Sequence, residues 1–224
     1  MTFFLLWFAL IVAVLDWIAV AKKRIRLEYV TKSAVMLILL LWVWQVSGFQ
    51  GQMLWFGLGI LFSLAGDIFL MLPRERFIAG LVSFLLAHIS YIIGLNNLLP
   101  DINLASLVLA AFVILASVTV TRRIITGIAV KGEERLKIPS LVYSAAISLM
   151  LYSALLTLVN PGWSFVSALP VSVGALLFYL SDISLAWIKF VAPLSHARLR
   201  IMVTYHLGQI LLVLGAAIHY VGIT

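Results

Sequence analysis

The sequence has 224 residues, of which 64% are hydrophobic and 10% are charged. Soluble domains are nearer about 45–50% apolar and about 25% charged, so this composition predicts an all-α, polytopic membrane protein. A chain of this length holds roughly eight spans of about 20 residues, and we expect one transmembrane domain over residues 1–224. The absence of cysteine excludes disulfides, thiolate metal sites and cysteine nucleophiles.

Four predicted helices occupy the first half of the chain, at residues 3–21, 28–47, 53–72 and 77–98. The segment 48–52 is uncharged and contains two glycines, which is typical of a turn. The third helix is expected to stop at Pro73, because proline cannot continue a helix. Residues 96–101 contain two asparagines, a proline and an aspartate, and they predict another turn.

Four more helices are predicted in the second half, at residues 103–121, 138–159, 164–190 and 199–221. The basic segment 122–137 lies between the first two and is expected to be the longest loop of the chain. A turn is predicted at residues 160–162, which read Asn-Pro-Gly. The fold predicted from the whole chain is a bundle of eight transmembrane helices.

The basic residues lie on one side of this predicted bundle. All fifteen lysines and arginines fall in, or within a few residues of, the segments that follow the first, third, fifth and seventh helices. By the positive-inside rule these segments are cytoplasmic and both termini are periplasmic, as in a multi-pass protein of a bacterial inner membrane. The net charge of +7 therefore reflects membrane topology, and no nucleic-acid partner is expected.

Three aspartates lie inside predicted spans. Asp16, Asp67 and Asp182 each stand about 7–12 Å from the cytoplasmic end of a helix. A carboxylate there costs at least ~2.5–3.5 kcal/mol, so it normally faces a partner or a wet cavity. We select Asp67 and Asp182 as the catalytic candidates. The alternative is that each aspartate pairs with a lysine or tyrosine and holds two helices together, and for Asp16 this alternative is equally strong.

Four other polar residues enter the membrane from the same side. Lys32 and Tyr205 reach a depth similar to that of the aspartates, whereas His88 and Gln209 lie nearer the middle of the bilayer. We expect these four to bind or orient a substrate, with Lys32 holding a phosphate. The alternatives are that Lys32 pairs with Glu28, four residues before it, and that His88 only packs between helices. No His, Asp or Glu set has a metal-ligand spacing, so no metal is expected.

The two candidate aspartates stand in similar strings, four predicted helices apart. The strings read Gly-Asp-Ile-Phe-Leu around Asp67 and Ser-Asp-Ile-Ser-Leu around Asp182. A histidine, His88 or His206, then follows in the next helix of each half. We therefore hypothesise that the first and last four helices are two repeats, related by a pseudo-two-fold axis along the membrane normal.

Several of these residues belong to a pattern that extends through nearly the whole chain. Its elements are Lys32, Ser63-Leu-Ala-Gly66-Asp67, Leu72-Pro73, Phe77, Gly80, Phe84, His88, Tyr91, Ser181-Asp182, Leu185, Phe190, Tyr205 and Gln209. This pattern resembles the YhhN-like lysoplasmalogenase family. One departure is Lys32-Ser33, where the family often has Lys-Pro. The resemblance implies eight transmembrane helices and hydrolysis of the vinyl ether bond of lysoplasmalogens. The products would be a fatty aldehyde and a glycerophosphoethanolamine or glycerophosphocholine.

The candidate residues suit that chemistry. Vinyl ethers hydrolyse by protonation of the β carbon, which gives an oxocarbenium ion that water captures. This requires a neutral carboxylic acid and a second, ionised carboxylate, the division of labour found in glycosidases. A lipid environment favours the neutral form of a carboxyl group, and neither metal nor cofactor is needed.

Two other functions fit the same residues. In a small transporter or lipid flippase, the aspartates would relay protons or bind a cation. In a lipid-binding partner protein they would have no catalytic role. Because the embedded charges reach only one leaflet, whereas a transporter needs a polar path through both, the sequence favours the hydrolase.

Overall fold

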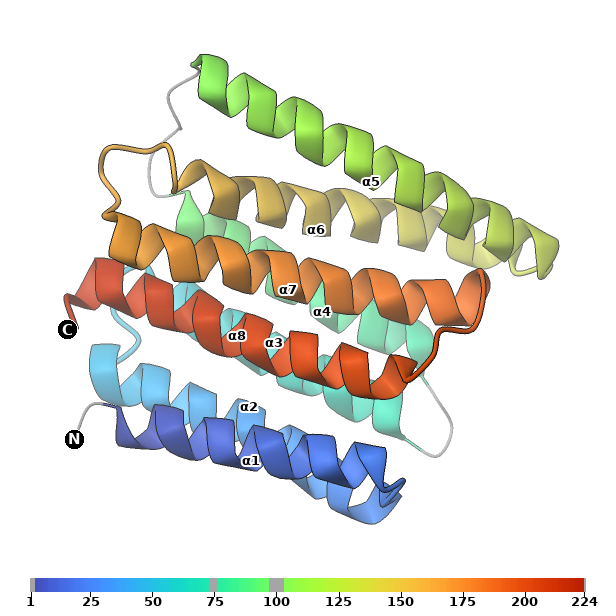
Figure 1. Cartoon of the computed structure of the whole chain (residues 1–224), viewed down its shortest axis with the longest axis horizontal. Coiled ribbons are helices and arrows are strands. Elements are labelled where there is room, and N and C mark those ends of the chain that lie inside the picture. The colour runs from blue at the N-terminus through green and yellow to red at the C-terminus, as the bar shows by residue number, and fades with distance from the viewer. Residues whose placement is uncertain (1–2, 73–75, 97–102, 224) are drawn as a thin grey trace.

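The computed structural model describes residues 3–72, 76–96 and 103–223 (Figure 1). In these ranges the chain forms eight helices long and apolar enough to cross a membrane, together with one short 3-10 helix, η1. The predicted all-α membrane fold is therefore confirmed. The helices are α1 (Phe4–Ala21), α2 (Ile25–Ser47), α3 (Met53–Met71), α4 (Phe77–Leu95), α5 (Leu104–Val130), η1 (Glu134–Leu136), α6 (Lys137–Leu156), α7 (Phe165–Phe190) and α8 (Ala197–Val221).

The prediction of a long basic loop at residues 122–137 is wrong. Helix α5 continues to Val130, so most of that segment is helical. The physical reason is that Ile124 and Ile128, one turn apart, pack against Leu136 and Phe190 beyond the predicted end of the span. Arginines mark where a helix leaves the lipid but do not stop it. The predicted stop at Pro73 and most of the predicted turn at 96–101 lie outside the described residues.

Seven of the helices form a closed ring. Neighbours around the ring are α1, α2, α3, α4, α6, α7, α8 and again α1. Helix α8 also contacts α2 and α3 and has the largest buried share of any span. Helix α5 lies outside the ring on α6 and α7, as the green helix at the top of Figure 1 shows.

Helices α7 and α8 pack so closely that glycine is required between them. A Cβ atom added to Gly208 would lie 2.8 Å from the backbone nitrogen of Phe178 and 2.9 Å from the carbonyl oxygen of Gly174. Small residues allow such approach between membrane helices. The contact fixes the α7 side chains relative to those of α8.

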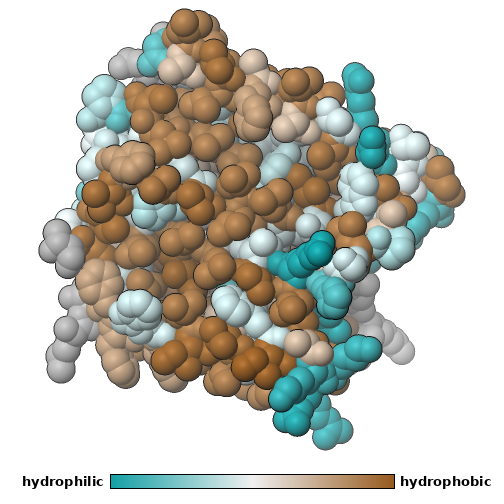
Figure 2. All heavy atoms as spheres, in the orientation of Figure 1, coloured by the Kyte–Doolittle hydropathy of each residue, from teal (hydrophilic) through white to brown (hydrophobic). Residues whose placement is uncertain are grey.

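Charged side chains gather at one end of the bundle. Figure 2 shows a broad hydrophobic surface and hydrophilic side chains at the right-hand end. The connections at residues 22–24, 131–136 and 191–196 lie there, and we call it the basic end. Both chain termini lie at the opposite end, as expected for an even number of spans (Figure 1).

The two halves of the chain share part of their packing. In each half consecutive helices are neighbours. When α1–α4 are matched with α5–α8, the contact between α4 and α6 corresponds to the contact between α8 and α2. The match is incomplete, because α1 packs against α8 whereas the corresponding helix α5 packs on α6 and α7. The predicted repeat relation therefore stays a prediction.

Candidate active site

Asp67 is buried near the basic end of α3 and has a cationic partner. Its side chain is 1% exposed, and its Oδ1 atom lies 2.9 Å from the Nζ atom of Lys32 in α2. The hydroxyl of Tyr205 in α8 donates a hydrogen bond of 2.7 Å to Oδ2. An ammonium group and a phenol donor form the set that an ionised carboxylate requires away from water. Lys32, Asp67 and Tyr205 thus connect α2, α3 and α8.

Asp182 in α7 has different partners. Its Oδ2 atom accepts a short hydrogen bond from the hydroxyl of Tyr143 in α6 and lies 3.2 Å from Nε2 of His88 in α4. The same histidine nitrogen is 3.0 Å from the Tyr143 hydroxyl. Asp182 thus shares a network with a phenol and an imidazole, two groups that can exchange protons with it.

A small cavity reaches Asp182. It has a volume of about 50 Å³, and Asp182, Tyr143, Ser140 and Ser144 supply its polar lining. The remaining wall is mostly apolar and comes from α3, α4, α5 and α7. The side chain of Asp182 is 10% exposed, and Asp67 is not among the lining residues. Of the two candidate aspartates, Asp182 is therefore the one that a substrate entering this cavity would meet.

Aromatic rings separate the two aspartate sets. The ring of Phe178 is 4.8 Å from that of His88 and 5.5 Å from that of Tyr205, measured between centroids. Phe84 packs edge-on against both Phe178 and Tyr205. Each aspartate has its own partners, and the two sets are joined through Phe178.

The helices that hold the two aspartates correspond. Asp67 in α3 is held from α2 of its own half and from α8 of the other half. Asp182 in α7 is held from α6 of its own half and from α4 of the other. This correspondence supports the repeat hypothesis more strongly than the short sequence similarity does.

Gln209 lies in a separate buried network. Its carbonyl oxygen accepts a hydrogen bond of 2.6 Å from the hydroxyl of Tyr91, and its amide nitrogen donates one of 2.9 Å to Ser63. Ser63 lies four residues before Asp67 in α3, and Gln209 lies four residues after Tyr205 in α8. The two bonds are therefore successive links between α3 and α8, and Gln209 contacts neither aspartate.

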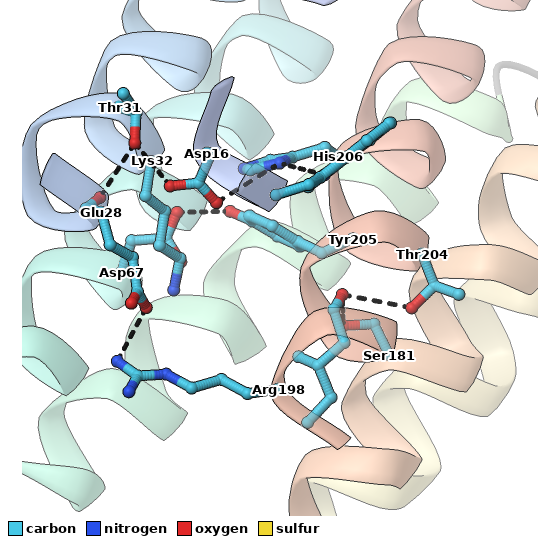
Figure 3. Close-up of polar contacts among 12 residues, drawn as sticks. Asp16, Glu28, Thr31, Lys32, Asp67, Ser181, Arg198, Thr204, Tyr205 and His206 are labelled. Carbon is cyan, nitrogen blue, oxygen red and sulfur yellow. Dashed lines mark hydrogen bonds and ion pairs between the residues drawn. The ribbon is translucent and has the colours of Figure 1, made fainter. Parts of the chain in front are cut away.

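Asp16 forms a further polar cluster, in which its partners come from α2 and α8. The hydroxyl of Thr31 donates a hydrogen bond of 2.6 Å to its Oδ1 atom, and its Oδ2 atom is 4.0 Å from Nδ1 of His206. That histidine nitrogen accepts a hydrogen bond from the indole of Trp17. Figure 3 shows Asp16, Thr31 and His206 converging from α1, α2 and α8.

The suggested pairing of Glu28 with Lys32 is not found. Glu28 lies 2.8 Å from Arg198 in α8, while Lys32 reaches inward to Asp67 (Figure 3). The reason is position on the helix. Glu28 lies near the basic end of α2, where Arg198 of α8 can reach it, and Lys32 is one turn deeper.

Sequence reasoning did not select Tyr143 as a site residue. Its depth in α6 was readable from the sequence, but the packing of α6 against α4 was not. Within the described ranges, no three or more His, Cys, Asp or Glu side chains lie close enough together to hold a metal ion. The chemistry available here is proton transfer between carboxyl, phenol and imidazole groups.

Comparison with known proteins identifies a family. The model of the YhhN family matches residues 27–216. The chain is 33% identical to the Homo sapiens protein "Lysoplasmalogenase TMEM86B" over 178 residues, which are 79% of this chain and 68% of that protein. It is 33% identical to the Rattus norvegicus protein of the same name over 188 residues, 83% of this chain and 71% of that protein.

A relative of the same name from Sus scrofa is 34% identical over 160 residues, 70% of this chain. The matched region is 61% of that protein, so the chain spans less than two thirds of its length. No solved structure matches. The family model covers well over half of the sequence, and this chain therefore belongs to the YhhN family.

Proposed function

We propose that this protein is a membrane-embedded lysoplasmalogenase, which hydrolyses the vinyl ether bond of a lysoplasmalogen. The products are a fatty aldehyde and glycerophosphoethanolamine or glycerophosphocholine. The observation that carries the proposal is Asp182, hydrogen-bonded to Tyr143, close to His88 and facing a cavity inside the membrane region. Family membership and the names of the relatives support the same chemistry.

The proposed orientation places the basic end in the cytoplasm of a bacterial cell and both termini in the periplasm. The lysines and arginines of the described ranges support it, because they concentrate at that end. Asp67 lies four residues before the end of α3 and Asp182 eight before the end of α7, or about 6 and 12 Å. The vinyl ether of a lysolipid lies just beneath its headgroup, so a cytoplasmic-leaflet substrate would reach this depth.

Asp182 is proposed as the general acid. Its carboxylic proton moves to the β carbon of the vinyl ether, and the resulting oxocarbenium ion is captured by a water molecule. The water proton returns to the Asp182 carboxylate, and the hemiacetal collapses as its hydroxyl proton passes to the departing glycerol oxygen. Tyr143 and His88 hold the carboxyl group in place and exchange protons with it.

Asp67 is proposed as the ionised partner of the pair. Its charge, maintained by Lys32 and Tyr205, stabilises the oxocarbenium ion across the ring of Phe178. Lys32 acts in this proposal by keeping Asp67 ionised, since its ammonium group is already engaged there. Gln209 orients the site indirectly, by fixing α3 against α8.

The transporter alternative receives less support. Within the described part of the chain, every Asp, Glu, Lys and Arg side chain in a helix lies in the half of the bundle near the basic end or at mid-depth. The described polar groups of the opposite half include serines, Asn96 and His219, and Asn96 and Ser90 bond to a neighbouring helix or to their own backbone. Among the residues that the structure describes, a transported cation would find no aspartate or glutamate along that half.

The variant Asp182→Asn should lose catalysis and keep its fold. Loss of a general acid typically lowers kcat by about 10²–10⁴-fold, so we expect a drop of at least ~10²-fold in aldehyde release. The wild-type reaction should be slower in heavy water, because proton transfer to carbon limits the rate. Activity of purified Asp182→Asn within a few-fold of wild type would refute the assignment.

The variant Asp67→Asn tests whether the second aspartate is catalytic or only structural. It leaves Lys32 buried without its partner, and breaking a buried pair costs about 3–5 kcal/mol. We therefore expect a lower thermal unfolding midpoint in detergent as well as lost activity. The double variant Lys32→Gln, Asp67→Asn removes both charges and should regain most of the stability. If it also regains activity, Asp67 is structural.

Fusion of a topology reporter tests the proposed orientation. A periplasm-active enzyme inserted at residues 160–162, or fused to the C-terminus, should be active in cells, whereas the same enzyme at Lys131 should be silent. Expression of each fusion is checked by immunoblot. An active reporter at Lys131 would reverse the orientation and move the site to the other leaflet.

A further inference from the structure

A cavity of about 350 Å³ opens at the basic end, next to the Asp182 cavity. Its charged lining consists of Arg76, which precedes α4, Arg135 in η1, Lys189 in α7 and Glu133, which precedes η1. The apolar lining comes from the first turn of α4 and from Leu136. We call it the basic cavity, because its lining includes three cations and one carboxylate from the described ranges.

The basic cavity is adjacent to the proposed reaction site. Phe77 lines both the basic cavity and the Asp182 cavity. Asp182 and Lys189 are seven residues apart in α7, which places them on one face about 10 Å from each other along the helix. A glycerol backbone and a lysine side chain together can span that distance.

A groove on the outer face of the bundle lies next to the Asp182 cavity. It lies between α5 and α6 and has a volume of about 910 Å³. Alanine, valine, leucine and isoleucine side chains supply more than half of its lining, and Arg122, Tyr152 and five serines and threonines supply the rest. Ser144 lines both this groove and the Asp182 cavity. The order along the protein is therefore a cationic cavity, a proton-donating cavity and the α5–α6 groove.

The charges of the basic cavity fit a zwitterionic phosphodiester. Arginine and lysine are the usual phosphate ligands, because their N–H groups form charge-assisted hydrogen bonds to phosphate oxygens. Glu133 offers a carboxylate for an ammonium group in the same cavity. Lys189 is held at the border of the two cavities, with its Nζ atom 4.3 Å from the centre of the Phe77 ring. Lys32 is paired with Asp67 and does not line this cavity.

We infer that the basic cavity binds the phosphate of a single-chain glycerophospholipid through Arg76, Arg135 and Lys189, with Glu133 facing its amine. The hydrocarbon chain of the same molecule lies in the α5–α6 groove. This inference rests on the proposed function, because it assigns the two ends of that substrate. The narrow middle cavity, about 50 Å³, favours a lipid with one chain over a lipid with two.

Kinetics of the double variant Arg135→Gln, Lys189→Gln test the headgroup site. For a lysoplasmalogen, KM should rise at least about tenfold while kcat stays close to wild type, because only binding is weakened. The matched control is Arg200→Gln, which changes an exposed arginine of α8 at the basic end and should leave KM unchanged. Lys189→Arg should keep most of the affinity. An alkenylglycerol without phosphate should be cleaved equally by all the proteins.

Binding of a saturated-ether lysophospholipid, which cannot be hydrolysed by this route, separates the two proposals. If wild type releases aldehyde and the double variant has an unchanged KM, the headgroup site is refuted and the hydrolase stands. If wild type releases no aldehyde but binds the ether lipid at least about tenfold more tightly than the double variant, the headgroup site stands alone. Equal binding by both proteins refutes the site.

The groove is tested by chain length. Ala145→Phe places a ring in the α5–α6 groove and should raise KM for a long-chain substrate, with little change for a short-chain one. Ala116→Phe is the matched control, on an exposed face of α5 that does not line the groove. An equal effect of Ala145→Phe on both chain lengths would place the chain elsewhere.

Discussion

The contact between Lys32 and Asp67 is the interaction on which the rest of this structure depends. Neither charge is stable alone inside a membrane, so the two side chains must meet, and their meeting sets the relative position of α2 and α3. Tyr205 adds α8 to the same point. The helix with the largest buried share is thus held by a polar contact as well as by glycine-mediated packing against α7.

The surroundings of the two aspartates differ, and the two roles proposed for them rest on that difference. Asp67 has a permanent cation beside it and is shielded from the cavity by aromatic rings. Asp182 has neighbours that both give and take protons, and it lines a small cavity. Two-carboxylate enzymes depend on such a difference, because one group must carry the proton that the other has lost.

The sequence was sufficient to predict the fold and to select the two candidate aspartates. Long apolar runs locate the spans because lipid demands them, and Asp67 and Asp182 stand out because a charge in such a run is costly. The sequence does not show which side chains contact one another, because these contacts depend on the order of the helices around the ring. Tyr143 was missed for that reason, and Lys32 was expected to bind phosphate although the fold turns it toward Asp67.

The position of α5 outside the ring determines how this protein would meet its substrate. The groove beside α5 opens sideways into the bilayer, and a molecule with a single hydrocarbon chain can enter it without leaving the membrane. Encounter then occurs by lateral diffusion in two dimensions. The rate would follow the mole fraction of the lipid in the leaflet, and dilution with inert phospholipid would slow the enzyme even at constant bulk concentration.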